Sequence, residues 1–250
     1  MALQWEAEGV VLGARAFGET SAVVEVFARA EGRVGGLVRG AKAARLRSLL
    51  QPGQLVHARW RARLEEHLGA YQLEAVRTPH PLEQWFAHYA SLLGVQNLCL
   101  LLRQLPEREA HQRLYDSARR LLALFGVPHA WPAQLARFEL LFLQDMGFGL
   151  DLTRCARTGV RDGLAYVSPR SGRAVTQEGA GRWRERLLPL PNFLLQGEAE
   201  EAASPRPADE ALHQAFALTG HFLAQRVFVG RGLPRLRHDM LAALNAAQPQ

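Results

Sequence analysis

The chain has 250 residues, of which 48% are hydrophobic and 22% charged, and its formal net charge is +6. This balance excludes a disordered or fibrous protein and is typical of a globular protein with one large or two smaller domains. No apolar run approaches the ~18 residues that cross a bilayer, and the first six residues lack the features of a signal peptide. Two cysteines, Cys99 and Cys155, cannot form a disulfide framework. The sequence therefore predicts a cytoplasmic protein without a membrane partner.

Short strands separated by turns are predicted for the first 78 residues. Residues 8–15, the β-branched run 21–27 and residues 33–39 are divided by turns at residues 18–19 and 31–32. After a Pro-Gly break at residues 52–53, residues 56–64 alternate between basic and apolar side chains, which is the period of a strand with two different faces. A last strand is predicted over residues 71–77. Five short strands in about 80 residues predict a small closed barrel of the OB type, a fold that binds oligonucleotides.

Basic residues are concentrated in this predicted barrel. Residues 29–63 contain nine basic side chains and one acidic side chain, Glu31, so the window carries 9 − 1 = +8 against +6 for the whole chain. A polyanion gains attraction here and releases counterions, which predicts nucleic-acid binding. The alternative is a solvated face in an arginine-rich protein, but that bias does not explain the missing acids. The predicted DNA-binding residues are Arg33, Arg39, Lys42, Arg45, Arg47, Arg59, Arg61 and Arg63.

From residue 81 the hydrophobic period becomes helical. Helices are predicted over residues 82–103, 107–125 and 132–146, over 176–188 with Thr176 as N-cap, and over 208–229 as the final helix. Residues 147–176 are glycine-rich and short-stranded. The predicted fold class is therefore α+β, with an OB-type barrel at residues 1–79 and a helical domain at residues 80–250 that contains a small hairpin insertion at 150–178.

No catalytic constellation is found in the sequence. Phosphate-binding glycine loops, a Gly-x-Ser-x-Gly elbow and paired-cysteine knuckles are absent. The nine histidines are scattered singly, and the carboxylates Glu139, Asp145 and Asp151 lack a metal-binding partner at a telling spacing. The sequence favours a binding protein over an enzyme.

Several short segments, taken in their order along the chain, resemble those of a known protein family. In the barrel these are residues 8–12 (Glu-Gly-Val-Val-Leu), 18–19 (Gly-Glu), 39–42 (Arg-Gly-Ala-Lys) and 50–53 (Leu-Gln-Pro-Gly), with Glu74 in the last strand. In this order, and followed by a helical remainder, they resemble the RecO family of bacterial recombination mediators. Residues 150–155 and 166–172 look like the zinc-finger region of that family, and residues 233–237 (Leu-Pro-Arg-Leu-Arg) like its closing pattern. The resemblance covers most of the chain.

One departure from the family pattern concerns metal. The resemblance implies two pairs of cysteines in this region, which form a four-thiolate zinc site. Here Cys155 is present, Thr158 stands where its near partner would be, no later cysteine follows, and no histidine lies between His129 and His213. A structural zinc site needs four N or S ligands. We therefore predict no metal and no cofactor, a hairpin held by packing and turns, and Cys155 as a packed thiol.

The resemblance implies a non-enzymatic protein of DNA repair, located in the cytoplasm at the nucleoid. Such proteins bind single- and double-stranded DNA, anneal complementary strands, and assist recombinase loading on DNA coated by single-strand-binding protein, with RecR as partner. The helical half is implied to receive the acidic C-terminal tail of single-strand-binding protein. A guanidinium fork matches a terminal carboxylate, and the candidates are Arg113, Arg119 and Arg120. The alternative is that these arginines are only the solvated side of an amphipathic helix.

Four further points stay open in the sequence. A basic barrel does not distinguish sugars, so an RNA-binding module in translation or RNA processing is the alternative function. A hydrolase with a nucleic-acid anchor is a third reading. Trp60 and Tyr71 are candidates for stacking on bases, although the alternation places Trp60 on the apolar face, which favours the core. A second basic cluster between Arg154 and Arg186 would extend the DNA track or receive an acidic protein tail.

Overall fold

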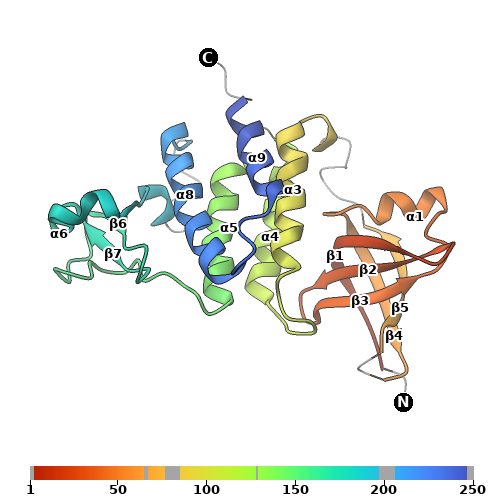
Figure 1. Cartoon of the computed structure of the whole chain (residues 1–250). Helices are drawn as coiled ribbons and strands as arrows, with labels where there is room; N and C mark the ends of the chain where they lie inside the picture. The colour runs from red at the N-terminus through yellow and green to blue at the C-terminus, as the bar shows by residue number, and fades with distance from the viewer. Residues whose placement is uncertain (1–2, 65–66, 77–84, 128, 197–205, 247–250) are drawn as a thin grey trace. The chain divides into compact units, whose positions relative to one another are not determined.

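The computed structural model describes residues 3–64, 67–76, 85–127, 129–196 and 206–246 (Figure 1). The chain divides into two compact units, the first comprising residues 1–128 and 236–250 and the second residues 129–235. The predicted boundary between residues 79 and 80 lies outside the described residues. No helix among the described residues is long and apolar enough to span a bilayer.

The N-terminal part of unit 1 is a closed five-stranded barrel. Its strands are β1 (Leu3–Phe17), β2 (Ser21–Ala28), β3 (Gly32–Val38), β4 (Leu55–Ala62) and β5 (Gly69–Ala75), in the order β1-β2-β3-β5-β4 with β4 pairing back to β1. The predicted OB-type barrel is thereby confirmed. β1 is longer than the predicted residues 8–15 because its first half pairs with β4 and its second half with β2, and the register shifts between Val11 and Gly13.

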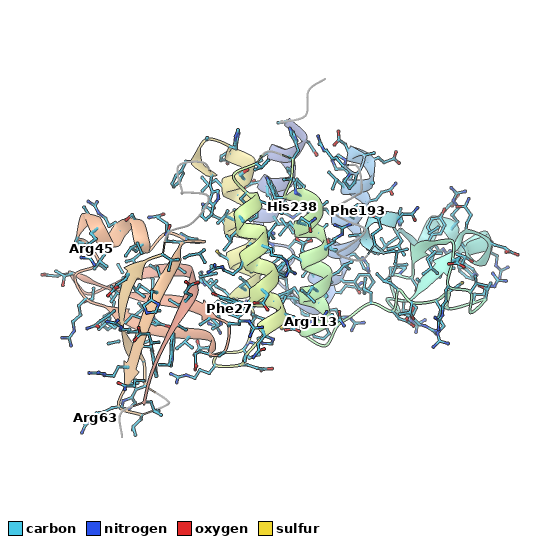
Figure 2. All side chains as sticks on the ribbon, turned by 180° about the vertical axis from the view of Figure 1, so that it is seen from behind. Phe27, Arg45, Arg63, Arg113, Phe193 and His238 are labelled. Carbon is cyan, nitrogen blue, oxygen red and sulfur yellow. The ribbon has the colours of Figure 1, made fainter. Side chains whose placement is uncertain are left out.

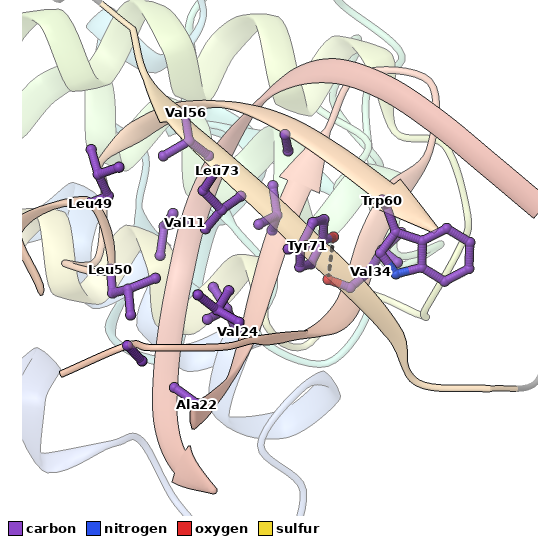
Figure 3. Close-up of a cluster of buried hydrophobic side chains, with 14 of the residues drawn as sticks. Val11, Ala22, Val24, Val34, Leu49, Leu50, Val56, Trp60, Tyr71 and Leu73 are labelled. Carbon is purple, nitrogen blue, oxygen red and sulfur yellow. Dashed lines mark hydrogen bonds between the residues drawn. The ribbon is translucent and has the colours of Figure 1, made fainter. Parts of the chain in front are cut away.

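The alternating side chains of the strands fill the barrel with an apolar core (Figure 3). Trp60 is 3% exposed and its Nε1 donates a hydrogen bond to the Gly35 carbonyl at 3.1 Å, while the hydroxyl of Tyr71 donates to the Val34 carbonyl at 3.1 Å. Glycines make room for the two rings, since a Cβ on Gly36 would lie 2.4 Å from the Tyr71 ring. Trp60 and Tyr71 are therefore core residues and are not available to stack on bases.

A short helix, α1 (Ala44–Leu49), connects β3 to β4 and was not predicted. Its residues are good helix formers, and Leu46, Leu49 and Leu50 follow the i, i+3, i+4 spacing of an apolar helix face. Leu49 and Leu50 join the barrel core, with Leu46 packed against it. Figure 1 shows α1 lying at one end of the barrel.

Among the described residues, unit 1 also contains α3 (Tyr89–Leu102), α4 (Gln112–Leu124) and, from residue 236 onward, α9 (Arg235–Ala246). The first part of the predicted helix 82–103 lies outside the described residues. α4 begins at Gln112 rather than at residue 107, because Glu107 bridges to β3 and Arg108 has a φ of 61°. The predicted helix over residues 208–229 is confirmed as α8 (Asp209–Arg226), but it is not the final helix, because α9 follows.

Ion pairs and an aromatic contact hold the barrel on α4. Arg29 donates to both carboxylate oxygens of Asp116 at 2.9 Å, and Arg119 pairs with Glu8 of β1 at 2.7 Å. Phe27 packs edge-on against Tyr115, with ring centroids 5.8 Å apart. Arg29 after β2 and Arg119 of α4 therefore form ion pairs within unit 1.

Unit 2 contains α5 (Pro132–Asp145) and α8 (Asp209–Arg226), which pack together through the buried hydrogen bond from Thr219 Oγ1 to Glu139. A small sheet in the order β7-β6-β8 is formed by β6 (Leu164–Val167), β7 (Ala174–Thr176) and β8 (Leu188–Pro189). The predicted N-cap at Thr176 is confirmed, because its hydroxyl accepts a 3.0 Å bond from the Gly179 N–H. The helix it caps, α6 (Gln177–Ala180), is short, and the 3₁₀ segment η1 (Gly181–Arg186) and a second 3₁₀ turn, η2 (Asn192–Leu194), follow.

Candidate nucleic-acid interface

Four of the predicted cations lie close together in the sequence, two on the connection from β3 to α1 and two on α1 itself. Arg39, Lys42, Arg45 and Arg47 are all exposed, and no acidic residue lies between them in the sequence. None of the four forms an ion pair with another residue that the structure describes. The Ala41 N–H donates a 2.7 Å hydrogen bond to the Thr20 carbonyl, which ties this connection to the β1–β2 turn. The cations therefore stand on an anchored backbone at the barrel end that carries α1.

The β1–β2 turn adds an aromatic side chain to the same end. Phe17 is 52% exposed, and Arg15 lies two residues earlier on the same strand face. Phe17 pairs with Ser21, and the next residue, Ala22, pairs with Val38, so the turn lies beside the chain segment that leads to Arg39. Sequence reasoning missed Phe17; its signal is its place on the Arg15 face directly before a glycine turn. We define the barrel rim as Arg15, Phe17, Arg39, Lys42, Arg45 and Arg47.

The cations of β4 are in a different environment. Arg59 pairs with Glu6 of β1 at 2.9 Å, and the His57 ring lies 2.6 Å from the same carboxylate. Hydrogen bonds from His57 and Arg59 lower the pKa of Glu6, so this carboxylate stays charged and offsets the basic face. Arg63 is exposed, yet Figure 2 shows it at the opposite end of the barrel from Arg45.

The eight predicted cations therefore do not form one continuous patch. Arg61 is exposed near Arg63 and donates a 3.3 Å hydrogen bond to Gln4, which is neutral. Arg33 differs most from expectation, because its side chain is only 14% exposed. It pairs with Glu25 at 2.6 Å and Glu107 at 3.2 Å, and it donates to the Leu105 carbonyl at 2.9 Å. Arg33 connects the barrel to the segment after α3, so we leave it out of the interface.

The three arginines predicted for partner binding do not share one face of α4. Arg113 and Arg120 are exposed and seven residues apart, which places them on one side of the helix, two turns apart. Arg119 points to another side and pairs with Glu8. The leucines interleaved with them, among them Leu114 and Leu121, are buried in the core. This part of α4 offers cations on one side, and its apolar side is already covered.

The hairpin region holds Cys155 without the ligands of a zinc site. Among the residues that the structure describes, no cluster of three or more His, Cys, Asp or Glu side chains could hold a metal ion. The Cys155 sulfur is buried and accepts hydrogen bonds from the backbone N–H groups of Thr176 at 3.3 Å and Thr158 at 3.5 Å. Burial alone would raise the pKa of this thiol, but hydrogen bonds from both threonines outweigh it and lower the pKa to about 6. Hydrogen-bond donors thus surround the sulfur.

Comparison with known proteins identifies similar sequences along nearly the whole chain. Residues 1–79 match the family model described as "Recombination protein O N terminal", and residues 88–234 match "Recombination protein O C terminal". The chain is 45% identical to "DNA repair protein RecO" of Chelativorans sp. (strain BNC1), with 99% of this chain and 98% of the relative covered. Identity to the protein of the same name from Methylobacterium nodulans is 45% with 98% and 99% covered, and to that from Rhodopseudomonas palustris (strain TIE-1) 46% with 92% and 90% covered.

Proposed function

Because the chain belongs to the RecO family of DNA repair proteins, we propose that it acts in recombination as a non-enzymatic mediator that binds DNA through its barrel rim. In this proposal it binds single- and double-stranded DNA in the cytoplasm at the nucleoid, and anneals complementary strands. It further assists recombinase loading on DNA coated by single-strand-binding protein.

The observation that carries the proposal is the set of four rim cations. Arg39, Lys42, Arg45 and Arg47 are exposed on α1 and on the segment that leads to it, and they pair with no described acid. Cations of this kind bind phosphates without reading sequence, which suits a protein that must accept any damaged site. Phe17 beside them offers a π-face on which a base can stack in a single strand.

The proposed protein partners are RecR and the C-terminal tail of single-strand-binding protein. We expect Arg119 to contribute less to tail binding than the other two arginines, because its side chain is paired with Glu8. Arg113 and Arg120 stay in the proposal as cations for the acidic part of the tail.

The test of the DNA proposal is charge reversal at the rim. The variant R39E/R45E should weaken binding of single-stranded DNA of any sequence. The matched control is R226E/R231E, which changes two exposed arginines of unit 2 and, like the rim variant, lowers the formal net charge from +6 to +2. If four phosphates are engaged, the logarithm of affinity should fall against the logarithm of salt concentration with a slope of roughly −3 for the wild type. Loss of two contacts should bring the slope of the rim variant to roughly −1.4.

Equal affinities and slopes for the two variants would overturn the assignment, because only a general charge effect would then remain. A structured RNA that binds more tightly than DNA, together with no annealing of DNA strands, would favour an RNA-binding function in translation or RNA processing instead.

A further inference from the structure

Trp183 in unit 2 is an exposed aromatic residue surrounded by arginines. It lies on the 3₁₀ segment η1 and is 46% exposed. The guanidinium carbons of Arg182 and Arg186 each lie 5.2 Å from the centre of its ring, within the range of cation–π attraction. Tryptophan is mostly buried in globular proteins, so its exposure between two cations is informative about function.

Further cations lie on η1 and close to its start. The Arg184 guanidinium lies over the ring of Tyr166 at 5.9 Å, and Arg157 donates a 3.2 Å hydrogen bond to the Gly179 carbonyl close to the start of η1. Glu185 is the single acid within η1. Over residues 154–186 there are eight arginines and three acids, so the segment carries 8 − 3 = +5. We define the Trp183 patch as Arg157, Arg182, Trp183, Arg184 and Arg186.

The chemistry of the patch matches a single strand of nucleic acid better than a peptide. A base needs only a flat π-face on which to stack, and the flanking phosphates need cations at short range. An acidic peptide that ends in an apolar side chain needs an apolar groove. The cavity described in unit 2, of about 250 Å³, is lined by Phe148, Phe222, Arg226 and neighbouring residues, and Trp183 does not line it.

We propose that the Trp183 patch is a second binding site for single-stranded nucleic acid, in which a base stacks on Trp183 and the arginines contact the adjoining phosphates. This proposal rests on the proposed function, because it assigns a second strand to a protein that binds a first strand at the barrel rim. Each unit then holds one strand. Two complementary strands held by one chain have a raised effective concentration, which favours their annealing.

Fluorescence of Trp183 can report binding at the patch directly. Of the five tryptophans in the chain, Trp60, Trp85 and Trp131 are buried and Trp5 is half-buried. A base stacked on an exposed indole quenches its emission, so quenching by a thymidine oligomer of about ten residues reports Trp183 preferentially, at a length within the site sizes of single-strand binders. The full-length protein should show this quenching and should bind two oligomers per chain.

Two substitutions of Trp183 distinguish base stacking from the fluorescence that reports it. Trp183→Phe keeps a ring for stacking but removes the fluorophore, so quenching should disappear while two oligomers still bind. Trp183→Ala removes the ring, so affinity at the second site should fall by roughly 5- to 150-fold. Because the side chain is exposed, both variants should melt like the wild type. The rim variant R39E/R45E should keep the quenching and, at oligomer concentrations too low to fill its weakened rim, bind one oligomer.

Each result decides between the proposals. Binding of one oligomer without quenching in the wild type, abolished in R39E/R45E, would overturn the Trp183 site and leave the rim site standing. Binding of one oligomer with quenching in the wild type, with both the affinity and the quenching unchanged in R39E/R45E, would support the patch and overturn the rim. An acidic peptide that quenches Trp183 when the oligomer does not would reassign the patch to a protein partner and overturn our inference.

Discussion

Two adjacent glycines of β3 allow a matched test of the barrel core. A Cβ added to Gly36 would lie 2.4 and 2.6 Å from atoms of the Tyr71 ring and 3.2 Å from the Trp60 ring. A Cβ added to Gly35, on the other strand face, would meet only the end of the exposed Leu68 side chain at 3.3 Å. We therefore predict that Gly36→Ala destabilises the barrel and Gly35→Ala does not.

The magnitude follows from comparing the two variants. Replacing glycine by alanine stabilises a compatible site by about 0.4–1 kcal/mol through the unfolded chain, and this contribution cancels between neighbouring positions. Overpacking a core costs about 1–3 kcal/mol. The rings of Trp60 and Tyr71 are held by hydrogen bonds to the backbone of β3, so they cannot swing away cheaply. We therefore expect the free energies of unfolding of the two variants to differ by about 3 kcal/mol, the upper end of the range for overpacking.

Thermal unfolding followed by circular dichroism measures this difference. For a chain of this size, about 3 kcal/mol corresponds to a Tm roughly 6–12 °C lower for Gly36→Ala than for Gly35→Ala. Equal melting temperatures would refute the reasoning, because the rings would then yield without cost.

The remaining predictions concern charges and the hairpin. Arg33→Ala should lower the free energy of unfolding by about 1–3 kcal/mol, because it removes charge-assisted hydrogen bonds at a largely buried site. Arg47→Ala should leave unfolding unchanged and weaken DNA binding; urea titration and a binding assay on both variants check this pair. The lowered pKa of the Cys155 thiol, about 6 against 9.0, should stabilise unit 2 above pH 9, and this stabilisation should be lost as the pH falls through about 6. Melting curves across this range should show the dependence in the wild type and not in Cys155→Ser. Metal analysis of untagged protein should find well under one zinc per chain, and stoichiometric zinc at Cys155 would contradict our account.

Local patterns were sufficient for several predictions. The period of two in β4 placed Trp60 inside and Arg59 outside, because strand alternation is a property of the backbone itself. The cap at Thr176 was also predicted correctly, because it too is a local feature: a capping hydroxyl bonds to an N–H only three residues away.

The sequence does not show which distant residues the fold brings together. Arg33 and Arg59 were assigned to the DNA surface from their charge, but their partners, Glu107 and Glu6, come from segments brought together by the fold. α1 is six residues long, which is too short for a helical period to be evident in the sequence. The sequence places Phe17 on the Arg15 face before a glycine turn, but only strand pairing shows that it lies beside the segment that leads to Arg39.

The position of Lys42 on the barrel rim has a practical consequence. It is the one lysine of the chain, and it is exposed among guanidinium groups. Guanidinium groups stay protonated and do not react with amine-selective reagents, whereas a lysine does. Such a reagent will therefore modify the chain at its amino end and at the rim, without any engineered labelling site. Protection of Lys42 by an oligonucleotide, read by mass spectrometry, would map occupancy of the rim in the unmodified protein.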